Sequence, residues 1–242
     1  MIKATLFNAA FYIWTAISAI LYIPALLLPK RYLLDAQWRW GRDINWLMGR
    51  IAGIEVEIRG RENLPDTPCI IASKHQSAWD TVSWLNIVRA PAIVLKSDLV
   101  WIPVYGVMCI KAGMVIVNRK GQSKALKKMI VDGQHALDEG RHIVIFPQGT
   151  RTAPDDDTSE KPYQIGIAAL YNGLDVPVTP VALNSGLFWP RRSWQRHPGK
   201  IVVEFLEPIP SGMKRKIFMR ELEEKIETAT ARLVAEGREG MA

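Results

Sequence analysis

The sequence predicts an α/β protein with a mostly buried mixed sheet flanked by helices, preceded by an N-terminal hydrophobic helical segment that anchors the chain to a membrane. From residue 54 onward, runs rich in Val and Ile alternate with helix-like segments, which is typical of a sheet covered by helices. Residues 4–29 contain no charged side chain. A chain of 242 residues can also bury a sizeable core. We therefore expect a membrane-anchoring helical segment at residues 1–50 and a globular domain at residues 51–242.

The apolar stretch at residues 4–29 is long enough to cross a bilayer if it forms one helix. It would then extend about 39 Å, against a hydrocarbon core of about 30 Å. Pro24 would kink or end this helix, so a hairpin that enters one leaflet is the alternative. Arg39, Arg42 and Arg50 follow the stretch and favour the cytoplasmic side for the domain. A cleaved signal peptide fits less well, because the stretch is too long and one lysine precedes it.

The next segment, residues 33–54, has the pattern of an amphipathic helix. Ile44, Leu47 and Ile51 recur at helical spacing, with arginines and tryptophans around them. Tryptophan beside arginine is typical of the membrane–water boundary. A soluble helix that covers the core is the other interpretation.

The remaining chain supplies the strands and helices of the expected sheet. Strand-like runs lie at residues 54–60, 68–73, 92–97, 114–119, 142–147, 176–183 and 200–206. Helix-like segments lie at Thr81–Val88, Ser123–Asp138, Gln164–Tyr171 and Lys214–Val234. Val- and Ile-rich strands that alternate with helices predict the α/β arrangement. The polar stretch at residues 151–162 is a loop by composition.

Composition narrows the kinds of partner. Nine tryptophans and a net charge of +7 suit anionic lipid headgroups or nucleic acid, and next to a membrane segment the lipid is the expected partner. Cys69 and Cys109 lie in apolar contexts without metal or disulfide spacing, which predicts buried free thiols in a reducing compartment. His135, His142 and His197 have no metal-type partner at ligand spacing, so we expect no metal site.

The stretch "SKHQSAWD" places His75 and Asp80 where a predicted strand gives way to a predicted helix. On one straight helix, five residues correspond to about 140° of rotation, and the two side chains would diverge. They can meet if His75 lies in the turn and Asp80 in the first part of the helix. The carboxylate would then fix the imidazole tautomer and leave the other nitrogen free to accept a proton. This is the base half of a catalytic triad, and the hydroxyl would come from a substrate.

Two further strand ends carry basic residues. "VIVNRK" ends with Arg119, and "IVIFPQGTR" ends in a turn with Gly149 and Arg151. Strand ends in an α/β fold face the crevice where ligands usually bind. Two arginines there suit a phosphate monoester, and Gly149 permits a close backbone approach. The Walker pattern GxxxxGK[ST] and the serine-hydrolase pattern GxSxG are both absent from the sequence.

The ordered set "HQSAWD", "VIVNR", "FPQGTR" and "VPVTPVA" resembles the four motifs of the glycerolipid acyltransferase family, in particular its bacterial 1-acyl-sn-glycerol-3-phosphate acyltransferases. The resemblance covers about residues 50–210. It implies transfer of an acyl group from acyl-CoA or acyl carrier protein to the sn-2 hydroxyl of lysophosphatidic acid, which gives phosphatidic acid. It also implies that residues 51–242 form an acyltransferase catalytic domain at the cytoplasmic face of the bacterial inner membrane. Apart from the acyl donor as co-substrate, it implies no cofactor.

The resemblance assigns roles by position. His75 would be the general base and Asp80 the residue that orients it, with backbone N–H groups at the start of the following helix as candidate oxyanion donors. Arg119 and Arg151 would hold the acceptor phosphate. The strand at residues 176–182 would line the acyl or acceptor channel.

Three more residues complete the expected site. Gly149 and Thr150 would shape the phosphate pocket. Lys96, at the end of the strand-like run 92–97, would add positive charge near it, although a solvated lysine is an equal alternative.

The chain departs from the family pattern at two positions. Lys74 replaces the usual Asn before the histidine, and it either adds charge near the phosphates of the donor or is exposed. Gln148 replaces the usual Glu of the third motif. Glutamine can donate and accept hydrogen bonds but cannot act as a base. We therefore expect Gln148 to position the acceptor hydroxyls while His75 supplies the base.

Two other functions remain open at this point. The acceptor could be another lyso-lipid, such as a lysophospholipid or a lyso-ornithine lipid. The chain could also be a catalytically silent membrane lipid-binding protein, which Gln148 alone favours. The expected partners are lysophosphatidic acid, acyl-CoA or acyl carrier protein, and membrane lipids, without nucleic acid.

Overall fold

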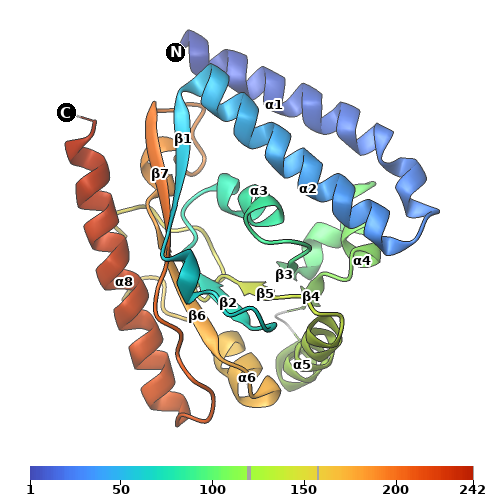
Figure 1. Ribbon diagram of the computed structural model, residues 1–242, viewed down its shortest axis with the longest axis vertical. Helices are drawn as coiled ribbons and strands as arrows, with labels where there is room; N and C mark the ends of the chain where they lie inside the picture. The colour runs from blue at the N-terminus through green and yellow to red at the C-terminus, as the bar shows by residue number, and fades with distance from the viewer. Residues whose placement is uncertain (119–120, 157, 242) are drawn as a thin grey trace.

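The computed structural model describes residues 1–118, 121–156 and 158–241. A seven-stranded sheet with the order β1-β7-β6-β2-β5-β3-β4 forms its centre (Figure 1). The strands are β1 Ile54–Arg59, β2 Ile70–Ser73, β3 Ala92–Lys96, β4 Val115–Val117, β5 Ile143–Ile145, β6 Val178–Leu183 and β7 Gly199–Phe205. Each lies within one of the seven predicted strand-like runs, apart from one residue at the start of β7.

The sheet is mixed, as predicted. Strands β6, β2, β5, β3 and β4 run parallel to one another, so their carboxyl ends meet at one edge. Strand β7 runs antiparallel to β6 and parallel to β1. The α/β fold class predicted from the alternation of strands and helices is confirmed.

The helices cover both faces of the sheet. They are α1 Ile2–Leu21, α2 Lys30–Leu47, α3 Ala78–Ile87, α4 Tyr105–Lys111, α5 Gln122–Asp138, α6 Ile165–Leu174, α7 Ser185–Phe188 and α8 Arg215–Glu239. In Figure 1, α1 and α2 lie side by side above α3 and α4, while α8 packs against β6 and β7. The short helices α4 and α7 were not predicted, because neither is long enough to show a helical period.

The N-terminal apolar stretch does not form the single helix of about 39 Å that would follow from its length. Helix α1 ends at Leu21, a short 3₁₀ turn at Ile23–Leu26 contains Pro24, and Pro29 precedes α2. Proline lacks a backbone N–H and cannot continue a helical hydrogen-bond ladder, which explains the break. Helix α1 has the length and hydropathy of a membrane-crossing helix. It is nevertheless one arm of a helical hairpin whose other arm is α2.

This hairpin shares the core of the main domain. Phe7 of α1, Leu33 of α2 and Met48 are fully buried in the same cluster as Trp79 of α3. The Phe7 ring contacts the edge of Trp189 at 5.1 Å between centroids. Complete burial of such a side chain contributes about 1.5–3 kcal/mol. The hairpin is therefore packed onto the sheet domain and does not hang from it on a linker.

Candidate active site

Most of the predicted site residues lie at the edge of the sheet where the five parallel strands end. His75 follows β2, and the segment from Gln148 to Arg151 follows β5, which is the neighbouring strand. Lys96 is the last residue of β3. Arg119 lies outside the described residues. The edge thus holds the first motif after β2, the third motif after β5 and Lys96 at the end of β3, as expected for the carboxyl ends of parallel strands.

The structure brings His75 and Asp80 together in the way that the sequence requires. His75 lies in the turn after β2, and Asp80 is the third residue of α3. The distance from His75 Nδ1 to Asp80 Oδ2 is 2.8 Å. The backbone N–H groups of Gln76 and Ser77 donate to the same oxygen at 2.7 and 2.9 Å. Ser77 caps α3, and its side chain accepts the N–H of Trp79.

These bonds fix the tautomer of the imidazole. Asp80 is 1% exposed, and its Oδ2 atom already accepts the backbone N–H groups of Gln76 and Ser77, so it is placed as the acceptor and His75 Nδ1 as the donor that carries the hydrogen. The other nitrogen, Nε2, makes no hydrogen bond to any residue that the structure describes. The imidazole stacks on the ring of Phe146 at 4.0 Å, with 13% of its side chain exposed. His75 is thus oriented on one side, covered on one face and open to a substrate.

The same bonds exclude three of the N–H groups that were candidate oxyanion donors. The N–H groups of Gln76 and Ser77 are taken by Asp80, and that of Trp79 by the Ser77 hydroxyl. These groups at the start of α3 are therefore unavailable to an oxyanion.

The second oxygen of Asp80 has a partner that sequence reasoning missed. Ser185 Oγ donates to Asp80 Oδ1 at 2.6 Å, and both side chains are buried. The N–H of Gly186 donates to Gln76 Oε1 at 3.0 Å. Both residues follow β6, the strand of the fourth motif. The only sequence signal was a short polar "NSG" between two apolar segments.

The segment after β5 is tied to His75 through its backbone. Gly149 adopts a φ of 65° in a tight turn, a conformation that glycine takes without strain. The N–H and the hydroxyl of Thr152 both donate to the His75 carbonyl oxygen, at 2.8 and 3.2 Å. Thr150 is partly exposed beside this turn. The third motif therefore lies directly against the first.

Two arginines meet at this turn. The Arg151 guanidinium forms no hydrogen bond or ion pair with any residue that the structure describes, which leaves it available to an anion. Its carbonyl oxygen accepts a hydrogen bond from Arg191 Nη1 at 2.8 Å. Arg191 comes from the loop after α7, so two chain segments bring arginines to the turn that follows β5.

Gln148 and Lys96 occupy different environments. Gln148 is buried, and its amide nitrogen faces the carbonyl oxygen of Lys161 at 3.4 Å. A neutral amide suits this buried position, whereas a carboxylate would face a carbonyl oxygen. Lys96 is exposed at the end of β3, two strands from β2 and hence about 10 Å along the edge.

Both sequence interpretations of Lys74 were wrong. Its side chain is 2% exposed, and Nζ bonds both carboxylate oxygens of Glu227 on α8 at 2.6 and 2.8 Å. Tyr163 donates its hydroxyl to the same carboxylate at 2.8 Å. Burial, and then the charge of Glu227, raise the pKa of Tyr163 well above its usual value, so it remains a donor. Lys74 therefore ties the end of β2 to α8.

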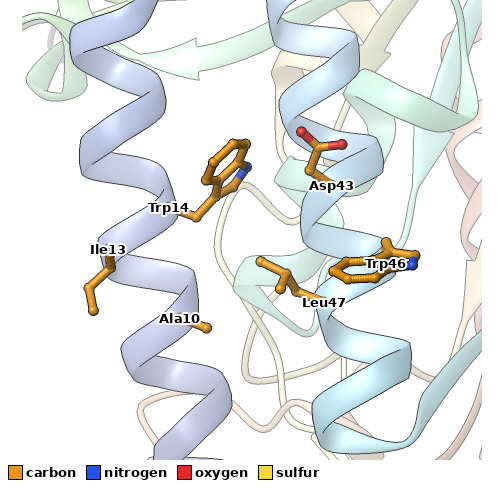
Figure 2. A pocket seen from close by; sticks show the side chains of 6 residues that line it. All are labelled: Ala10, Ile13, Trp14, Asp43, Trp46 and Leu47. Carbon is orange, nitrogen blue, oxygen red and sulfur yellow. The ribbon is translucent and has the colours of Figure 1, made fainter.

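An apolar groove lies away from the His75 site. Figure 2 shows it between α1 and α2, where it is lined by Ala10, Ile13, Trp14, Asp43, Trp46 and Leu47. Its lining is mainly apolar, and no residue of the His75 site contributes to it. This groove belongs to the helical hairpin.

The geometry defines a class of protein. A buried carboxylate holds one imidazole, and no serine or cysteine of the described chain is bonded to that imidazole. Unpaired positive charge lies alongside. Such a site suits a transferase that activates a hydroxyl on an anionic substrate. In the described residues, no group of three or more His, Cys, Asp or Glu side chains is placed to hold a metal ion.

Comparison with known proteins identifies the family. The model of the acyltransferase family matches residues 55–184, which include the dyad and the third and fourth motifs. The chain therefore belongs to the acyltransferase family and is an O-acyltransferase. It is 34% identical over 198 residues to a 1-acyl-sn-glycerol-3-phosphate acyltransferase of Pseudomonas aeruginosa, covering 82% of this chain and 75% of the relative.

Two further comparisons, at lower sequence identity, give proteins with similar names. The human 1-acyl-sn-glycerol-3-phosphate acyltransferase alpha is 28% identical over 162 residues, which cover 66% of this chain and 56% of the human protein. The crystal structure of the 1-acyl-sn-glycerophosphate (LPA) acyltransferase, PlsC, from Thermotoga maritima superposes with a TM-score of 0.73. The superposition covers 95% of this chain and 94% of the other at 22% identity. At that identity the similarity shows the fold alone. Because the superposition covers 95% of this chain, the shared fold includes the helical hairpin.

Proposed function

We propose that this protein transfers an acyl group from acyl-CoA or acyl carrier protein to the sn-2 hydroxyl of 1-acyl-glycerol-3-phosphate, forming phosphatidic acid. The observation that carries the proposal is the bond of His75 Nδ1 to a buried carboxylate, with Nε2 open to a hydroxyl. The curated relatives that match the chain are named for this acceptor. The unpaired guanidinium of Arg151 suits its phosphate.

His75 acts as the general base in this mechanism. Its Nε2 takes the proton of the acceptor hydroxyl while the oxygen attacks the thioester carbonyl carbon. The tetrahedral oxyanion collapses, the carbon–sulfur bond breaks, and the thiolate takes the proton from the imidazolium. Asp80 stabilises the imidazolium between the two proton transfers. General-base assistance contributes about 10²–10⁴-fold in rate, and positioning contributes further.

The acceptor phosphate is held by positive charge at the sheet edge. Arg151 provides a guanidinium that can bind phosphate through two N–H groups. Lys96, at the end of β3, adds charge farther along the same edge. Arg119, from the second sequence motif, is the other residue proposed to hold the phosphate. Gln148 donates its amide hydrogen toward Lys161, so its carbonyl oxygen is the atom left to position an acceptor hydroxyl.

Arg151→Ala distinguishes the proposed acceptor from other lyso-lipids. We expect the KM for 1-acyl-glycerol-3-phosphate to rise about 10-fold or more, because at least one charge-assisted hydrogen bond to the phosphate monoester is lost. For an acceptor without a phosphate monoester, such as lysophosphatidylcholine, the KM should change little in this variant. The measurement is transfer of a labelled acyl group from acyl-CoA to each acceptor in detergent.

The control for this variant is Arg220→Ala, an exposed arginine on α8. It removes the same charge from a different part of the surface and should leave the KM unchanged. An unchanged KM for 1-acyl-glycerol-3-phosphate in Arg151→Ala would contradict recognition of its phosphate by Arg151 and favour a different lyso-lipid as substrate. Absence of transfer from any acceptor by the wild-type protein would favour the catalytically silent alternative.

We also propose that the helical hairpin anchors the domain to the cytoplasmic face of the membrane by entering one leaflet. The N-terminal part of α1 is bonded to the main domain: Asn8 Nδ2 donates to the Trp194 carbonyl at 2.8 Å, and Trp194 Nε1 donates to Thr5 Oγ1 at 3.1 Å. A helix held along its first turns against the domain is poorly placed to cross the bilayer. The far end of the hairpin is apolar, and Ile20 and Leu27 there are 68% and 90% exposed.

Charge at the hairpin tip should weaken this anchoring. With Ile20→Glu and Leu27→Glu together, we expect binding to anionic phospholipid vesicles to fall about 10-fold, because two apolar side chains no longer enter the interface. Co-sedimentation with vesicles measures this. Val131→Glu with Ile217→Glu changes two exposed apolar residues on α5 and α8 and serves as the matched control. Equal binding by all three proteins would contradict a hairpin anchor.

A further inference from the structure

The two oxygens of the Asp80 carboxylate accept different numbers of hydrogen bonds. Its Oδ2 atom accepts three hydrogen bonds, from His75 Nδ1 and from the N–H groups of Gln76 and Ser77. Its Oδ1 atom accepts one, from Ser185 Oγ at 2.6 Å. The three donors to Oδ2 come from neighbouring residues of one turn and fix the position of that atom. The rotation of the carboxylate about Oδ2 depends on the single donor at Oδ1.

The position of Ser185 is itself fixed from two sides. Its neighbour Asn184 is buried; Asn184 Nδ2 donates to the Leu233 carbonyl of α8 at 3.1 Å, and Asn184 Oδ1 accepts the N–H of Val202 in β7 at 2.8 Å. Both polar ends of this amide are therefore used to hold the start of α7. Through these two hydrogen bonds, Asn184 links the end of β6, the strand of the fourth motif, to β7 and to α8.

The residue after Ser185 lies equally close to the dyad. The N–H of Gly186 donates to Gln76 Oε1 at 3.0 Å. A Cβ atom at Gly186 would lie 3.0 Å from the Cβ of Gln76 and 3.0 Å from Pro154 Cγ, which is tighter than ordinary contact. Glycine thus allows the backbone after β6 to approach the residue next to His75. Three consecutive residues, Asn184 to Gly186, form a rigid support for the turn that carries the base.

We propose that Ser185 is a positioning residue of the catalytic dyad: its hydroxyl sets the plane of the Asp80 carboxylate and thereby the direction in which His75 Nε2 points. The proposal rests on the proposed function only for its consequence in catalysis. The bond itself and its effect on the imidazole exist whether or not an acyl group is transferred. Ser185 acts through Asp80 and touches no reacting atom.

The test compares three variants in detergent micelles. Ser185→Ala removes the donor. Ser185→Cys keeps nearly the same volume with a much weaker donor. Ser83→Ala removes another buried hydroxyl, which lies on the same helix as Asp80 and donates to the Trp79 carbonyl at 2.8 Å without touching the dyad. Ser83→Ala therefore reports any loss of stability that is unrelated to positioning.

The first measurement is the hydrogen-bonded Nδ1–H proton signal of His75, observed by NMR in protein with labelled histidines and assigned with His75→Ala. The chain has four histidines, so the spectrum is simple. We expect this proton to exchange with water about 10-fold faster in Ser185→Ala and in Ser185→Cys, and at the wild-type rate in Ser83→Ala. The second measurement is kcat, which should fall about 10-fold in both Ser185 variants with the KM for the acceptor within 2-fold, because misorientation of the base affects the transition state.

An unchanged Nδ1–H exchange rate in Ser185→Ala would overturn the proposal, as would wild-type behaviour of Ser185→Cys, since volume alone would then explain the serine. Equal effects of Ser83→Ala would also overturn it. If the wild-type protein transferred no acyl group to any acceptor, the proposed function would fail, while the NMR comparison would still decide the role of Ser185.

Discussion

His75→Ala is expected to lower kcat for acyl transfer by about 10³-fold, the middle of the range that general-base assistance contributes. In the proposed mechanism, His75 Nε2 accepts the proton of the acceptor hydroxyl, and Gln148 cannot replace it as a base. The fold should survive, because the side chain makes one hydrogen bond, to Asp80, and one ring contact, with Phe146. Initial rates of labelled acyl transfer and a thermal melt of the same preparation give both quantities.

His135→Ala is the matched control for this variant. His135 lies exposed on α5 and makes no contact with the dyad. Its replacement should leave kcat unchanged and the melting temperature close to that of the wild type. Near-wild-type transfer by His75→Ala would contradict the mechanism, because no other titratable side chain of the described structure is bonded to Asp80.

Asp80→Asn is expected to lower kcat about 10- to 100-fold with little change in stability, and the structure explains why the geometry should persist. Three N–H groups point at the position of Oδ2, so the amide of Asn should place its oxygen there. Its NH₂ group then faces Ser185 Oγ, which can accept a hydrogen bond. The His75 tautomer is kept, and only the negative charge is lost. A charge-assisted hydrogen bond contributes about 1.5–3 kcal/mol, which corresponds to this range of rates.

A thermal melt of Asp80→Asn distinguishes an effect of the lost negative charge on kcat from an effect of disturbed packing on stability. A melting temperature within a few degrees of the wild type, together with the loss of kcat, would show that the carboxylate charge assists the reaction. Asp80→Ala should be worse in both respects, because it also removes the acceptor for the N–H groups of Gln76 and Ser77. Full activity of Asp80→Asn would mean that the imidazolium needs no counter-charge.

The strands were predictable because most are short apolar runs bounded by polar or turn residues, and β1 alternates apolar with charged residues. Helices α5 and α8 were predictable because they are long enough to show a period. Helix α7 has four residues and α4 has seven, so neither carries a readable pattern. The break of the apolar stretch was foreseen at Pro24, but a single proline does not reveal whether a helix bends or reverses.

The site residues differ in the same way: contacts between residues close along the chain were predictable, and contacts between distant residues were not. His75 and Asp80 were predictable as a pair because they are five residues apart, and the turn between strand and helix decides their meeting locally. The partners of Lys74 and Asp80 were not, because Glu227 and Ser185 are 153 and 105 residues away in the chain. The sequence around Lys74 indicated a charge beside a catalytic residue, and only the position of α8 showed that this charge is buried and paired.

The amino-acid sequence by itself determined which residues form strands, where the imidazole and its carboxylate meet, and which strand ends carry arginine. These features depend on contacts between residues close along the chain, where spacing and side-chain type are sufficient. The tertiary structure alone decided the strand order that places β6 and β5 on either side of β2, the packing of the N-terminal hairpin on the sheet, and the serine that holds the carboxylate. These depend on segments distant in the chain, which become neighbours only when the common core is buried.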